Sequence, residues 1–262
     1  MNIEGLEFSI LGPAFIAGLL ILATHVPLGQ EVLKRGIIFM DLAIAQIAGL
    51  GVIAASRFGW ETHGWEVQLA AVGSALTAAI ALAWLEKHYQ KYQEALIGVT
   101  FILAATASLL LLANNPHGGE SLKDLLVGQI LWITWEQLLP TALVAGLISL
   151  VLFIFKQRLN HLGFYLLFAV AVTSSVQLVG VYLVFASLII PALGSVDQRR
   201  ALLTGYLIGG SGYGLGLIVS SLMDLPSGAV IVWCIATIAL LFKLFTKRQN
   251  ELGTAITGTD AL

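Results

Sequence analysis

One acidic residue, Asp41, lies well inside an apolar segment that is long enough to cross a membrane. A carboxylate in hydrocarbon is costly unless it is paired, faces water or binds a cation, so this position indicates a function. Two interpretations are open: Asp41 lines a path for a cation, or it pairs locally with Lys34 or Arg35, about 1.5 helical turns away. Gln46 lies about 140° further around the same helix, so it is a weaker candidate, equally suited to an interhelical hydrogen bond.

Two histidines lie near carboxylates in segments expected on the outer side of a membrane. His63 has Glu61 and Glu66 beside it, and His117 is followed by Glu120. Imidazole suits zinc and other transition metals, and carboxylates also suit manganese. No spacing matches a closed metal site. The pattern therefore predicts, at most, loops that collect a divalent cation at an entrance, with a small preference for zinc.

The composition shows what must position these residues. Of 262 residues, 58% are hydrophobic and only 11% are charged, and the mean hydropathy is +0.92. These values exclude a soluble globular domain and predict an all-α polytopic membrane protein with 8–9 transmembrane helices. The single cysteine, Cys234, excludes an internal disulfide and a paired-cysteine metal site. This composition does not predict a nucleic-acid partner.

Apolar runs of roughly 20 residues mark the expected spans. We place them at 8–25, 37–56, 67–85, 95–113, 138–155, 163–179, 180–195, 202–222 and 226–246. The runs 163–179 and 180–195 share one hydrophobic stretch, which fits either two spans or one span followed by a re-entrant helix. His25, just before Pro27, is expected to end the first span, and Pro191 is expected to terminate a helix.

Lysine and arginine residues predict the orientation, because they concentrate in short cytoplasmic loops. With nine crossings and the N-terminus outside, eleven of the 13 basic residues fall inside, and only Arg57 and Lys123 fall outside. Residues 1–248 are thus expected to form the membrane domain. The Gly/Thr-containing segment 249–262 is expected to be a disordered cytoplasmic tail.

Four blocks of sequence, at 28–41, 94–131, 179–192 and 216–228, carry a family resemblance. They include Phe39-Met40-Asp41, the glycine block Glu94-Ala95-Leu96-Ile97-Gly98, the apolar run that ends at Pro191, and a Leu-Pro-Ser-Gly segment. In their order and spacing they resemble the integral membrane permeases of zinc, manganese and sometimes iron ABC importers. One departure is clear: members of this family commonly carry a histidine four residues after the aspartate, where this chain has Ala45.

The resemblance implies the ABC importer permease fold and a homodimer in the bacterial cytoplasmic (inner) membrane. It also implies a separate ATPase subunit, an extracytoplasmic metal-binding protein, and no permanently bound cofactor, the divalent metal being the cargo. The chain contains no phosphate loop of the Gly-x-x-x-x-Gly-Lys-[Ser/Thr] type, so we expect it not to be an enzyme. Asp197, Arg199 and Arg200 are expected to dock the ATPase, although they also fit an ordinary positively charged inner loop.

Two other classes of function are alternatives. A secondary, ATP-independent transporter of cations or small solutes usually shows paired broken helices in corresponding halves, and the sequence has one candidate break, at Pro191. A membrane enzyme needs several catalytic groups at membrane depth, and Asp41 alone does not supply them.

Overall fold

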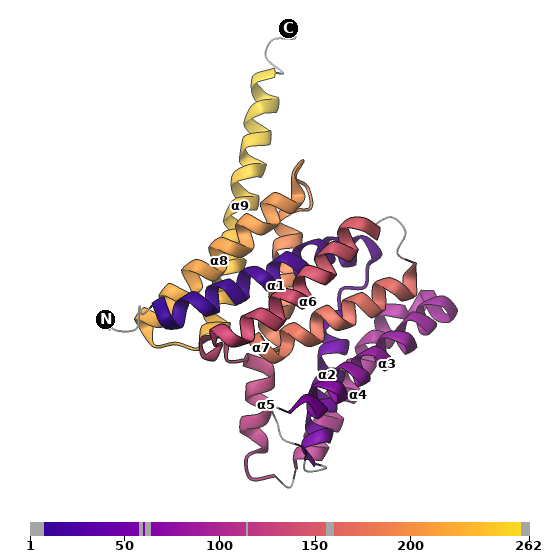
Figure 1. Cartoon of the computed structure of the whole chain (residues 1–262). Helices are drawn as coiled ribbons and strands as arrows, with labels where there is room; N and C mark the ends of the chain where they lie inside the picture. The colour runs from indigo at the N-terminus through magenta and orange to yellow at the C-terminus, as the bar shows by residue number, and fades with distance from the viewer. Residues whose placement is uncertain (1–7, 58–59, 61–63, 114, 156–159, 258–262) are drawn as a thin grey trace.

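The computed structural model describes residues 8–57, 60, 64–113, 115–155 and 160–257, and all regular elements in these ranges are helices (Figure 1). Two short 3-10 turns, Gln90–Tyr92 and Ile130–Trp132, connect longer elements. The α-helices are α1 (Phe8–Arg35), α2 (Met40–Arg57), α3 (Trp65–Tyr89), α4 (Gln93–Leu112), α5 (Gly118–Val127), α6 (Trp135–Phe155), α7 (His161–Ser195), α8 (Ala201–Met223) and α9 (Ser227–Thr257).

The described chain contains seven helical segments that are long and apolar enough to cross a membrane. This number is smaller than the predicted eight or nine spans because two pairs of predicted spans are each joined in one segment. The segment Trp65–Leu112 contains both α3 and α4, and α7 covers the runs 163–179 and 180–195. The all-α membrane class is confirmed, and the difference lies in how neighbouring spans are connected.

Helix α1 does not end near His25 but continues through Pro27 to Arg35. A proline in a helix leaves the carbonyl four residues earlier without its usual N–H partner. Here that carbonyl belongs to Ala23, and it accepts a hydrogen bond from the Tyr206 hydroxyl of α8 at 3.2 Å. A neighbouring helix thus satisfies the freed group, as membrane helices with proline require.

Helix α7 bends at Gly180, whose φ of 78° and ψ of 165° are not helical. At its start, Phe164 lies beneath the guanidinium group of Arg35, the last residue of α1. Near its end, Ala192 packs against Gly29, also in the last third of α1. Gly180 instead touches the far end of α5. The two halves of α7 therefore run into the bundle and back, so its two ends lie on the same side.

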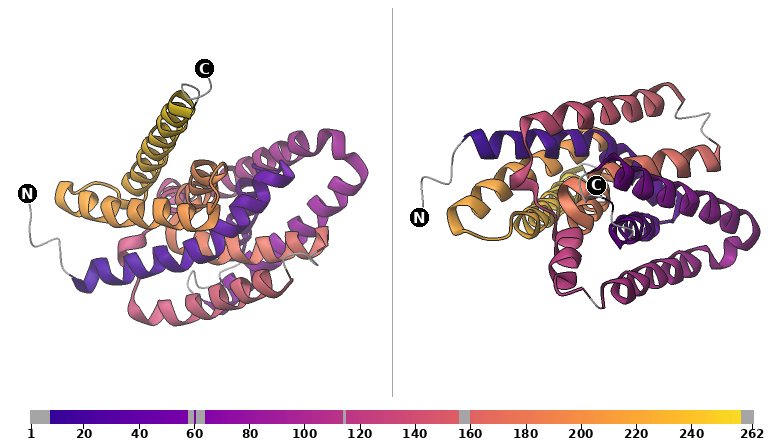
Figure 2. Two further views of the ribbon diagram at one scale, coloured as in Figure 1. Left: turned by 90° about the horizontal axis from the view of Figure 1, so that it is seen from above. Right: turned by 60° about the horizontal axis from the view of Figure 1, so that its bottom comes forward.

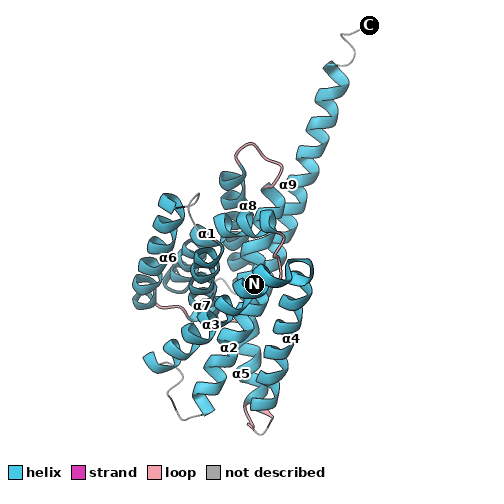
Figure 3. Cartoon of the chain, turned by 90° about the vertical axis from the view of Figure 1, so that its right-hand side faces the viewer, coloured by secondary structure: helices cyan, strands magenta, loops and turns pink. Residues whose placement is uncertain are grey.

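Helices α1 and α8 lie side by side and antiparallel, because Gly18 contacts Tyr213 while Val26 contacts Gly205 (Figure 2). Helix α2 packs against α3, α4 and α7, so it lies inside the bundle. The short helix α5 contains Glu120 and Lys123, both expected on the outer side. Helix α9 runs to Thr257, into the segment where a disordered tail was expected, and its end extends away from the bundle (Figure 3).

Candidate functional site

Asp41 lies in the first turn of α2, and its side chain is 1% exposed. Neither of its carboxylate oxygens has a hydrogen-bond partner among the residues that the structure describes. Burying a charged group without a partner is unfavourable, and natural proteins retain such groups mainly at functional positions. The carboxylate is therefore the strongest candidate in the chain for binding a cation.

The basic residues suggested as local partners of Asp41 are engaged elsewhere. Lys34 Nζ lies 3.8 Å from Glu31 Oε2, and Arg35 Nε lies 3.6 Å from Glu31 Oε1. The Arg35 guanidinium carbon also lies 4.2 Å from the centre of the Phe164 ring. This arrangement removes the geometric basis for a local ion pair with Asp41.

Gln46 follows Asp41 on α2, and its side chain is 3% exposed, with Oε1 lacking a partner in the described chain. Glu94 of α4 holds the start of α2, because its Oε1 accepts a hydrogen bond from the Phe39 backbone N–H at 3.4 Å. An acceptor at a helix N-terminus satisfies one of the N–H groups that the helix leaves free. Glu94 is a positioning residue that sequence reasoning missed, because its partner is 55 residues away.

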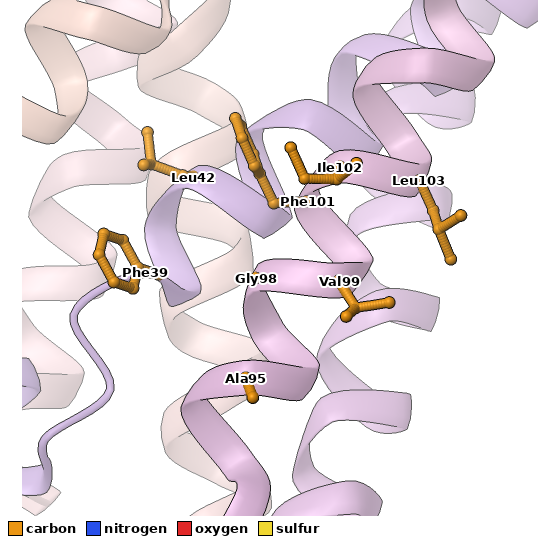
Figure 4. A pocket seen from close by; sticks show the side chains of 8 residues that line it. All are labelled: Phe39, Leu42, Ala95, Gly98, Val99, Phe101, Ile102 and Leu103. Atoms are coloured by element: carbon orange, nitrogen blue, oxygen red, sulfur yellow. The ribbon is translucent and has the colours of Figure 1, made fainter.

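Next to Asp41, an open apolar groove of about 530 Å³ lies between the start of α2 and α4 (Figure 4). Phe39 and Leu42 form one side, and the other is formed by the α4 residues Ala95, Gly98, Val99, Phe101, Ile102 and Leu103. Every lining side chain is apolar, so the groove offers an ion no ligand. Asp41 and Gln46 are instead enclosed by their own chain and are almost fully buried.

The structure describes only part of the predicted entrance loops. His117 immediately precedes α5, and its Nδ1 lies 3.2 Å from Glu120 Oε2, with both side chains about four-fifths exposed. Glu61 and His63 lie outside the described residues, while Glu66 lies in the first turn of α3. In the described ranges, no three His, Cys, Asp or Glu side chains come close enough to hold a metal ion. The pair at the start of α5 can thus offer two ligands.

The segment 196–200 joins α7 to α8 and presents Asp197, Arg199 and Arg200 at the surface. Asp197 Oδ2 lies 3.6 Å from Lys243 Nζ of α9.

Pro191 was expected to end the preceding helix, but α7 continues to Ser195, whose Oγ donates to the Pro191 carbonyl at 2.7 Å. The bend of α7 lies at Gly180, where a residue without a Cβ permits positive φ.

His25, expected at a membrane boundary, is instead fully buried in α1. Its Nδ1 lies 3.0 Å from the Ile21 carbonyl oxygen and 2.9 Å from the Thr24 hydroxyl oxygen. Its Nε2 has no partner in the described chain. The prediction that His25 ends the first span was wrong, because α1 continues through Pro27.

Relatives with similar sequences extend over nearly the whole chain. An uncharacterized membrane protein of Synechocystis is 26% identical over 94% of this chain and 94% of its own length. A manganese transport system membrane protein, MntC, of Halalkalibacterium halodurans is 23% identical over 94% of this chain and 91% of its own length. These similarities agree with a multi-pass membrane protein.

Among solved structures, PsaBC from Streptococcus pneumoniae in complex with a Fab has a TM-score of 0.75 to this chain at 20% identity. The match covers 94% of this chain and 98% of that chain, which confirms the predicted fold. The model of the ABC 3 transport family matches residues 7–164 and 156–246. Because these two matches together include both the Asp41 region and the segment 196–200, and far more than half of the sequence, the chain belongs to the ABC 3 transport family.

Proposed function

We propose that this chain is the permease subunit of an ATP-driven importer of a divalent transition metal ion. The observation that carries the proposal is Asp41, a buried carboxylate without a hydrogen-bond partner in the described chain of an ABC transport permease. Such a group binds a cation favourably while it holds no fixed charge partner. A site with few ligands also releases the ion readily, as transport requires.

Manganese is the first metal to test, although the exposed histidines favoured zinc. Asp41 and Gln46 supply oxygen ligands, and Ala45 stands where related permeases commonly carry a histidine. Carboxylate and carbonyl oxygens suit manganese, whereas zinc prefers nitrogen or sulfur ligands. The manganese transport protein of Halalkalibacterium halodurans supports the same order of testing.

The proposal includes three partners. A separate ATPase subunit supplies energy by docking on the segment 196–200, which is exposed and carries charges of both signs. An extracytoplasmic binding protein delivers the ion to the side that holds His117 and Glu120. A second copy of the permease completes the transporter, since closed two-fold symmetry is the most common arrangement of identical subunits.

The test is uptake of radioactive manganese into vesicles that contain the permease with its ATPase and binding protein. Asp41→Asn removes the charge while keeping the size, so we expect uptake to be lost while expression and complex assembly are retained. Asp124→Asn is a matched control, because Asp124 is an exposed carboxylate on α5. Full uptake by Asp41→Asn at limiting manganese would contradict a charged path group at this position. Competition by zinc would measure the selectivity.

A further inference from the structure

Helix α5 contacts three parts of the chain that are far apart in sequence. Its Leu125 side chain packs directly against Gly49 of α2. Its last residue, Val127, places its backbone against Gly228 at the start of α9, and Gly128, just after it, touches Gly180 at the bend of α7. Helix α5 thus meets the helix that carries Asp41 and Gln46, the turn of α7, and the start of α9.

The contact between Gly128 and Gly180 is made by backbone on backbone. Both residues have positive φ, 70° and 78° respectively. A Cβ at Gly180 would lie 2.6 Å from the Val127 carbonyl carbon, and a Cβ at Gly128 would overlap the backbone of Val179. Positive φ and the absence of space both require glycine. The end of α5 therefore fits closely into the turn of α7.

The rest of α5 is held loosely. Within α5 only Gly118 is buried, and Leu125, Leu126 and Val127 are half-buried. Elements with few buried contacts open at low free-energy cost and are the ones that move during function. Two of the elements that α5 touches, α7 and α9, also meet at the opposite end of the bundle, where Asp197, after α7, pairs with Lys243 of α9 at 3.6 Å.

We propose that α5 is a latch that moves off α2 during the transport cycle and carries the turn of α7 with it. The physical chain is continuous: Gly49 contacts Leu125, Gly128 contacts Gly180, and the second half of α7 leads to the segment 196–200. A change at the ATPase surface thereby reaches the helix that carries Asp41. This role rests on the proposed function, in which the segment 196–200 receives the ATPase.

A reversible disulfide tests the latch. In a Cys234→Ser background, Gly49→Cys with Leu125→Cys joins α5 to α2, since Leu125 Cγ lies 3.1 Å from the position of a Cβ on Gly49. The matched control is Leu22→Cys with Gly209→Cys, which joins α1 to α8 with the corresponding distance at 3.3 Å. Both pairs allow the short Cβ–Cβ separation that a disulfide needs.

In vesicles with the ATPase and binding protein, we expect oxidation of the α5–α2 pair to abolish manganese uptake and its associated ATP hydrolysis. Reductant should restore both activities, and the oxidised α1–α8 pair should retain both. Equal activity of the oxidised and reduced α5–α2 pair, with the disulfide verified by mass, would overturn the latch. If the reduced protein hydrolyses ATP but moves no manganese, the result contradicts manganese as the cargo and leaves the latch to be tested by hydrolysis. The effect of oxidation on hydrolysis would then decide the latch.

Discussion

At the scale of single residues, burial separates the candidate ligands into two kinds. Asp41 is enclosed and has no hydrogen-bond partner in the described chain, whereas His117 and Glu120 form an exposed pair. An exposed pair of this kind contributes little energy and is screened by salt. An isolated buried carboxylate costs at least about 2.5 kcal/mol on membrane-insertion scales. Because burying Asp41 is costly, its presence indicates a function. The exposed pair costs little, so its presence does not distinguish a metal-binding role from an ordinary surface contact.

The hydrogen bond from Tyr206 to the Ala23 carbonyl gives a prediction at this scale. Tyr206→Phe should lower the free energy of unfolding by about 0.5–1.5 kcal/mol, because the carbonyl freed by Pro27 loses its donor. Pro27→Ala restores a backbone N–H for that carbonyl, so the same Tyr206 change should cost less in a Pro27→Ala background. Thermal unfolding in detergent of the four proteins in this double-mutant cycle measures the difference. An equal cost in both backgrounds would show that the hydroxyl does not serve this carbonyl.

At the scale of elements, α7 joins the interior of the bundle to an exposed charged segment. Its first half starts beside Arg35, and its second half ends at Ser195 just before Asp197. Since the bend lies at Gly180 and not at Pro191, the second half is one continuous helix into the segment 196–200. A rigid helix transmits displacement along its length, which suits the coupling that we propose for this segment.

Reversing the charge at Arg199 and Arg200 tests this segment. Both side chains are exposed, so Arg199→Glu with Arg200→Glu should leave the permease folded. We expect weaker association with the ATPase and less stimulated ATP hydrolysis, because charges at the rim of an interface mainly tune docking. Lys87→Glu with Lys91→Glu is the control, since these residues also carry charge at the ends of helices but lie outside the segment. Normal co-purification and normal stimulation would remove the segment from this role.

At the scale of the whole molecule, the fold-back of α7 bears on orientation. Because both ends of α7 lie on the side where α1 ends, Arg199 and Arg200 lie on the same side of the bundle as Lys34 and Arg35. Lys243 joins them through its ion pair with Asp197. The basic residues of the described chain therefore gather mainly on one side, which the positive-inside rule assigns to the cytoplasm.

This orientation predicts the accessibility of single cysteines placed in a Cys234→Ser background. Lys123→Cys on the exposed face of α5 should react with a membrane-impermeant thiol reagent applied from outside intact cells. Lys87→Cys and Arg199→Cys should react only after the membrane is opened. Labelling of position 87 or 199 in intact cells would reverse the orientation or alter the number of crossings.

The sequence by itself determined the membrane class and the approximate place of most spans, and it singled out Asp41 as a candidate ligand. These follow from hydropathy and from the cost of a charge in hydrocarbon, and both are properties of a local segment. The order of four sequence blocks also indicated the family. Local composition was therefore sufficient for the class of protein and for one candidate ligand.

Only the tertiary structure decided which groups meet. It assigned Lys34 and Arg35 to Glu31, kept α1 helical through Pro27 by means of Tyr206, and placed Glu94 at the start of α2. It also showed that α7 continues past Pro191 and that its bend lies at Gly180, the predicted boundary between the runs 163–179 and 180–195, where the end of α5 leaves no room for a side chain. The pairs with Glu31 lie three and four residues apart on one helix, and there the structure decided only between two local partners, Glu31 and Asp41. The other three cases share one physical reason: a hydrogen bond or a close backbone contact depends on segments that are distant in the chain, and a local pattern carries no information about such partners.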